Sequence, residues 1–163
     1  MVNAKKYNAT YRVLKPGDES GNVGEIEYVA PINAKEEIKI VANVKINGIS
    51  YVVTSVADGA FKGNTKIKSV TVGDSVTKIS ASAFSKCTKL EKVTLGKNVE
   101  SIGKYAFYKC KKLKSITVNS KKLKTIYKAA FKGISGKVVV NVPAKKLKNY
   151  TKLFNARGIK NIK

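Results

Sequence analysis

Clustered lysines are the side chains in this sequence best suited to binding a ligand. The tetrapeptide Lys-Lys-Leu-Lys occurs at residues 111–114, 121–124 and 145–148, each time in the pattern x-B-B-x-B-x, where B is basic. Flexible ammonium groups bind sulfates and phosphates without requiring one geometry, and such clusters are typical of heparin-binding patches. The sequence therefore predicts polyanion binding by nine lysines: Lys111, Lys112, Lys114, Lys121, Lys122, Lys124, Lys145, Lys146 and Lys148.

An alternative explanation of the same clusters is structural. Leu113 and Leu123 fall at core positions of a repeat described below, and the lysines beside them would then be solvated neighbours in a lysine-rich chain. The compositional bias toward Lys, Asn and Ile favours this alternative.

The positive charge is unevenly distributed. The net charge is +23, and residues 101–163 carry 18 basic and no acidic side chains. Such a gradient attracts polyanions, and salt screens the attraction. Specific nucleic-acid binding is not predicted, because the chain has two Arg and no Trp and carries none of the common RNA- or DNA-binding motifs.

The sequence argues against catalysis. Histidine is absent, which excludes imidazole bases, Ser-His-Asp systems and histidine-ligated zinc. The acids are scattered and no Gly-rich phosphate-binding loop is present. We therefore predict a protein that is not an enzyme, with no catalytic residues, no metal site and no cofactor.

Two cysteines, Cys87 and Cys110, lie one repeat apart and should be neighbours in the fold. They could form a disulfide or a reactive pair, or they could be two small side chains in equivalent core positions. We favour the core positions, because a bridge requires Cα atoms within about 4.4–6.8 Å of each other.

An internal repeat dominates the chain. Ala-Phe recurs at residues 60–61, 83–84, 106–107 and 130–131, in steps of 23, 23 and 24 residues, and the surrounding apolar positions keep the same step. Within each unit a stretch such as Leu90-x-x-Val93-x-Leu95 alternates with period two, which predicts one short strand per unit with one buried face. The Ala-Phe segment predicts a turn or short helix, and Gly73, Gly96 and Asn119 follow the strands where a positive φ is expected.

Outward-facing strand residues should form columns across the stacked units. This sheet face is a common docking surface in repeat proteins. The alternative is a soluble face of good strand formers, and we favour binding. The predicted ligand-binding residues are Ser69, Thr71, Lys92, Thr94, Ser115, Thr117 and Asn141.

The flanking segments differ from the repeat. Residues 1–52 contain alternating stretches at 10–14, 25–29 and 38–46, which predict β-hairpin strands that cap the first coil. Residues 144–163 place Leu147, Tyr150, Leu153 and Phe154 at helical spacing before Gly158, which predicts a helical cap. Four repeats would occupy residues 53–143.

The chain resembles the BspA-like leucine-rich-repeat family of bacterial surface proteins. The pattern I-x-x-x-A-F-x-x-C-x-x-L-x-x-V-x-L-G is complete at residues 79–96, and at 102–119 except for Asn119 in place of Gly. Asn64 and Ile134 stand where the family often has Cys. The expected fold is an α/β repeat solenoid: a right-handed leucine-rich-repeat coil with short parallel strands, an N-terminal β-hairpin cap and a C-terminal helical cap.

The resemblance implies a function in adhesion. Our leading hypothesis is a secreted or cell-surface binding module, monomeric, that contacts a protein ligand such as a host matrix protein. The alternatives are a binder of anionic polysaccharide, either glycosaminoglycan or cell-wall polymer, and a passive spacer. No apolar run is long enough to cross a bilayer, so membrane insertion is not predicted, and an export signal would lie outside this sequence.

Overall fold

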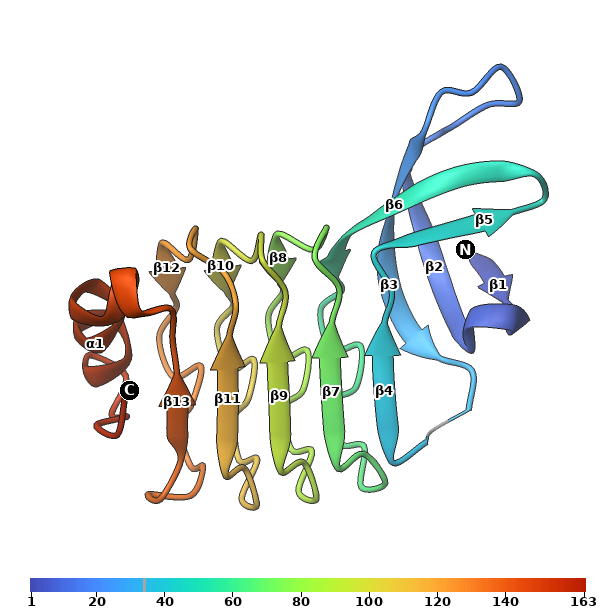
Figure 1. Ribbon diagram of the computed structural model, residues 1–163. Helices are drawn as coiled ribbons and strands as arrows, with labels where there is room; N and C mark the ends of the chain where they lie inside the picture. Colours follow the sequence, from blue (N-terminus) through green and yellow to red (C-terminus); the bar gives the residue numbers. More distant parts are fainter. Residues whose placement is uncertain (34) are drawn as a thin grey trace.

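Each repeat forms one coil, and the coils stack side by side into a solenoid (Figure 1). The computed structural model describes residues 1–33 and 35–163. A five-stranded parallel sheet runs along the front, in the order β13-β11-β9-β7-β4. Its strands are β4 (Glu37–Ile40), β7 (Ser69–Val72), β9 (Lys92–Leu95), β11 (Ser115–Val118) and β13 (Val139–Asn141). The predicted repeat solenoid is confirmed.

A second sheet contains the other strand of each coil. Its repeat strands have two residues each: β8 (Lys78–Ile79), β10 (Ser101–Ile102) and β12 (Thr125–Ile126). The N-terminal region extends this sheet through β6 (Ile49–Val56), β3 (Gly24–Pro31), β2 (Ala9–Lys15) and β1 (Val2–Ala4), while β5 (Asn43–Ile46) pairs with β6. A short 3-10 helix, η1 (Lys5–Tyr7), links β1 to β2. The Ala-Phe segments form turns, so no coil contains an α-helix within residues 53–143.

The N-terminal strands differ from the expectation in one respect. The stretch 38–46, expected as a capping strand, is divided between two sheets. β5 forms an antiparallel hairpin with β6, whereas β4 pairs in parallel with β7, with Ile38 opposite Val70. β4 therefore extends the repeat sheet upstream of the first predicted repeat.

A column of aromatic rings runs through the core. Phe61, Phe84, Phe107 and Phe131 stack nearly parallel, with ring centroids 4.9, 5.2 and 5.3 Å apart. Tyr28 stacks on Phe61 at 5.2 Å, and Tyr11 meets Tyr28 edge-on. At the other end Phe154 of α1 (Leu147–Asn155) packs on Phe131 at 5.7 Å. Equivalent side chains of successive coils thus share one continuous interior.

The expected role of the glycines after the strands was wrong. Gly73, Gly96 and Asn119 do not have positive φ angles. Gly73 and Gly96 are required because the coils approach closely: a Cβ on Gly96 would lie 2.3 Å from the backbone oxygen of Gly73. The left-handed positions lie instead on both sides of the Ala-Phe pair, at Gly59, Ser82, Tyr105 and Ala129 and at Gly63, Lys86, Lys109 and Gly133.

The C-terminal segment satisfies backbone groups of the last coil. The Tyr150 hydroxyl accepts a hydrogen bond from the Leu123 N–H and donates one to the Ser120 carbonyl, both at 3.0 Å. Arg157 Nε donates to the Ile126 carbonyl at 2.7 Å, and Ile162 forms a parallel bridge with Val140 on β13. Between β13 and α1 lies the 3-10 helix η2 (Ala144–Lys146).

Candidate binding surface

The front sheet displays two straight columns of outward side chains. Direct pairing aligns Thr71 with Thr94, and Thr94 with Thr117. One column is Ser69, Lys92, Ser115 and Val139, and the other is Thr71, Thr94, Thr117 and Asn141; Glu37 and Lys39 of β4 extend them. All of these side chains are exposed or partly exposed, whereas the alternate strand residues are buried. The structure thus places the seven sheet-face residues predicted from sequence on one surface.

Ion pairs between coils border the start of these strands. Glu36, Lys68, Glu91 and Lys114 follow one another from coil to coil, with Glu36–Lys68 at 2.8 Å and Glu91–Lys114 at 2.9 Å. The hydrogen bond and charge of Lys114 lower the pKa of Glu91, and those of Glu36 raise the pKa of Lys68. Because these side chains are exposed, each pair stabilises the fold only slightly.

Similar pairs lie beyond the other end of the strands. Asp74 and Lys97 are 3.1 Å apart, and Glu100 and Lys124 are 2.9 Å apart. The hydrogen bond and charge of Lys124 lower the pKa of Glu100. Lys114 and Lys124, both predicted to bind polyanions, are therefore already held by a carboxylate of the preceding coil.

The three Lys-Lys-Leu-Lys clusters do not form one patch. Residues 111–114 precede β11 and residues 121–124 follow it, so these two clusters lie at opposite ends of one strand. Residues 145–148 belong to η2 and the first turn of α1. Leu113 and Leu123 are buried core residues, whereas Leu147 is exposed.

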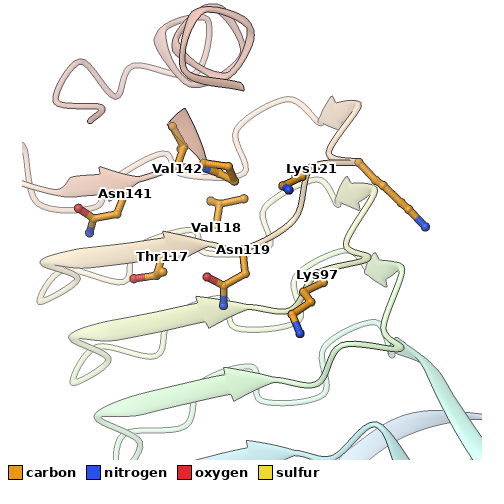
Figure 2. A pocket seen from close by; sticks show the side chains of 9 residues that line it. Lys97, Thr117, Val118, Asn119, Lys121, Asn141 and Val142 are labelled. Carbon is orange, nitrogen blue, oxygen red and sulfur yellow. The ribbon is translucent and has the colours of Figure 1, made fainter. Parts of the chain in front are cut away.

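A groove of about 600 Å³ lies at the corner that follows β9, β11 and β13 (Figure 2). It combines members of both predicted sets, because Thr117 and Asn141 come from the sheet face and Lys121 and Lys122 from a lysine cluster. Sequence reasoning missed the remaining lining residues: Lys97, Val118, Asn119, Val142 and Pro143. In the sequence most of these residues share only their position, because they end a strand or follow one directly.

The groove offers cations, amides and an apolar wall. Lys121 and Lys122 are exposed, and no acidic residue lines the groove. Asn119 and Asn141 contribute side-chain amides, while Val142 and Pro143 contribute apolar surface. This set of groups suits an anionic ligand that also has hydrogen-bonding groups.

Both cysteines are buried free thiols in equivalent core positions. Cys87 Sγ donates to the Phe61 carbonyl and Cys110 Sγ to the Phe84 carbonyl, each at 3.0 Å. Burial raises the pKa of Cys87 to about 12 and also raises the pKa of Cys110. Thiols that stay protonated make poor nucleophiles, so the pair has the properties of core packing rather than of a reactive site.

Among residues 1–33 and 35–163, no three His, Cys, Asp or Glu side chains gather as a metal site would require. Within the same residues no helix has the length and apolar character to span a membrane.

Comparison with known proteins agrees with the architecture. Residues 40–162 match the family model of the BspA type leucine rich repeat region, in six copies. No curated protein matches the chain significantly.

Solved structures include close matches to the fold. A leucine-rich repeat protein from Bacteroides capillosus ATCC 29799 has a TM-score of 0.71 and 25% identity, covering 88% of this chain and 98% of that one. A leucine-rich repeat protein from Bacteroides ovatus ATCC 8483 has a TM-score of 0.66 and 27% identity, and the match covers 85% of this chain and 37% of that one. A leucine rich cell surface protein from Faecalibacterium prausnitzii A2-165 has a TM-score of 0.51 and 19% identity, and the match covers 93% of this chain and 52% of that one. At this identity the likeness extends to the fold alone.

Proposed function

Since the chain belongs to the BspA-type leucine-rich-repeat family, whose members are typically surface proteins that bind partners, we propose that it is a non-catalytic cell-surface or secreted module that binds a protein ligand through its front sheet. Repeats of this kind are generally non-catalytic, and the sheet face and corner groove contain no convergent acid, base or nucleophile. The proposed partner is a protein of the host matrix or of the cell wall.

The observation that carries this proposal is the alignment of outward side chains on the front sheet. Thr71, Thr94 and Thr117 stand in register across three neighbouring strands. β-branched side chains have few rotamers, so they lose little conformational entropy when a partner docks. A rigid, uncharged column of threonines, with Lys92 in the column beside it, is therefore a favourable contact surface.

The area of the front sheet indicates how much additional surface a protein partner must contact. Five strands of about four residues, spaced about 4.8 Å apart, present roughly 250 Å² of flat face. A stable protein interface buries about 800 Å² on each partner. A protein ligand bound to the sheet would therefore also cover the corner groove beside Thr117 and Asn141.

Capture experiments test the sheet face. The immobilised chain is exposed to host extracellular-matrix extract and to bacterial wall extract at moderate salt. We expect at least one protein to be retained, and to be lost from the variant Thr94→Arg/Thr117→Arg. The matched control is Ser101→Arg/Thr125→Arg, which adds the same charge to neighbouring strands of the second sheet. No retained protein would identify a passive spacer instead, and equal retention by both variants would mean that the partner does not contact the front sheet.

Binding of an anionic polymer in the corner groove is a second candidate function. The observation that favours it is the pair Lys121 and Lys122, exposed in a groove without acidic residues and located in the part of the chain that has none. Point charges of this kind suit sulfate or phosphate groups.

Heparin chromatography tests the groove with two matched variants. Lys121→Gln/Lys122→Gln and Lys111→Gln/Lys112→Gln remove equal charge from opposite ends of β11. We expect the first variant to elute at clearly lower salt than the second. Equal shifts would mean that heparin responds only to net charge, which would eliminate the groove as its site.

A further inference from the structure

A third surface, separate from the front sheet and the groove, lies on the Ala-Phe turns and centres on the third repeat. Tyr105 and Tyr108 flank the buried Phe107. The equivalent residues are Ser82 and Ser85 in the preceding repeat, Gly59 and Lys62 in the first, and Ala129 and Lys132 in the fourth. Among the four repeats only the third carries aromatic side chains at these two positions.

The two rings stand beside a hollow. Their centroids are 5.4 Å apart in an edge-to-face arrangement, and Tyr105 is 38% exposed. The hollow has a volume of about 270 Å³ and is lined by Lys62, Ser82, Ser85, Lys86, Tyr105 and Tyr108. It forms where the large rings of one coil follow the small serines of the coil before.

Backbone geometry argues that Tyr105 is not there for stability. Its φ is 59°, in the left-handed region that disfavours every residue with a Cβ. The equivalent Gly59 has φ 66°, which glycine adopts without strain. The same left-handed φ occurs at the equivalent Ser82 and Ala129, so it belongs to the turn, and a partly exposed aromatic ring placed there gains little from burial.

Positive charge surrounds the hollow. Lys62 and Lys86 line it, and no carboxylate does. Lys104 Nζ lies 5.1 Å from the centroid of the Tyr105 ring, and Lys109 Nζ lies 5.1 Å from that of Tyr108. Each ring therefore has an ammonium group close to it, while Tyr105 remains 38% exposed.

We propose that this hollow binds a sugar ring of an acidic polysaccharide. The C–H face of a pyranose is apolar and packs on an aromatic ring, while its hydroxyl groups need nearby donors and acceptors. Ser82, Ser85 and the tyrosine hydroxyls supply these, and Lys62 and Lys86 pair with a carboxylate or sulfate on the sugar. The proposal does not depend on the sheet face, because the two surfaces share no residue.

Affinity electrophoresis with three polymers tests the proposal. Polygalacturonate supplies acidic sugars, dextran neutral sugars and polyglutamate charge without sugar. We expect the chain to bind polygalacturonate more tightly than either of the others. Tyr105→Ser/Tyr108→Ser copies the residues of the preceding coil, and should weaken polygalacturonate binding about tenfold, or about 1.4 kcal/mol. The groove variant Lys121→Gln/Lys122→Gln should retain most of that binding.

Several results would overturn the proposal. One is unchanged polygalacturonate affinity in the tyrosine variant; another is an equal loss of polyglutamate binding, which would show that charge alone is recognised. Tyr105→Gly provides a check independent of folding defects, because it relieves the left-handed strain at this position. We expect it to raise the melting temperature while weakening polygalacturonate binding, and an unchanged affinity would refute the role of Tyr105. Neither result bears on the proposed protein binding by the front sheet, which the variant Thr94→Arg/Thr117→Arg tests separately.

Discussion

Gly96 shows how a single residue sets the distance between two coils. A Cβ at this position would lie 2.3 Å from the Gly73 oxygen and 2.6 Å from its carbonyl carbon, and neither atom belongs to a flexible side chain. A Cβ on Gly73 would likewise clash with the backbone of residues 40–42. The close approach of successive backbones at this corner therefore requires glycine for lack of space, not for a special φ.

Gly96→Ala should consequently destabilise the protein. Forcing a methyl group into occupied space costs about 1–3 kcal/mol, and more where backbone must move. The matched control is Gly136→Ala, where nothing lies within 4 Å of the added Cβ and φ is not positive. Urea unfolding followed by circular dichroism should show a lower midpoint for the first variant and little change for the second. Equal midpoints would contradict the packing shown at this corner.

Local sequence cues failed at these glycines for a physical reason. A glycine after a strand usually indicates a turn with positive φ, because that chemistry depends only on neighbouring residues. The clash at Gly96 involves a residue one coil away, which no local pattern reveals. The same limit applies to Ser82, Lys86 and Ala129, non-glycine residues held in the left-handed region by the stacked turns around them.

Periodic patterns in the sequence predicted the strands of the repeats well. The alternation within each unit predicted the strands of the front sheet, and the spacing of Tyr150 and Phe154 predicted α1, which ends shortly before Gly158. β4 was missed as a repeat strand because its partner Val70 is 32 residues after Ile38, and the β5–β6 hairpin accounts for the longer step. The division into segments 1–52, 53–143 and 144–163 stays a prediction.

The candidate sites were predictable to different degrees. Period-two alternation identifies the outward columns directly, since Thr94 and its neighbours must point away from Val93 and Leu95. The groove depends on how three corners meet, so Lys97 and Pro143 carry no sequence signal of their own. The lysine clusters look alike in sequence, yet β11 separates two of them.

For the whole molecule, the aromatic column joins the N-terminal strands, the repeats and α1. Tyr28 and Phe154 continue the stack of four phenylalanines at its two ends. In a solenoid each coil contacts only its neighbours, so stability passes from one interface to the next. The rigid face proposed to bind a partner depends on this continuity.

Native-state hydrogen exchange on Phe84→Leu is the measurement that tests this continuity most directly. Phe84 lies in the middle of the column, stacked on Phe61 and Phe107, and the substitution should cost about 1–3 kcal/mol. If the column makes one cooperative unit, the slowest amides of β3 and of β11 should lose the same free energy of exchange. A loss confined to the coils beside Phe84, with β3 unchanged, would contradict a single continuous interior.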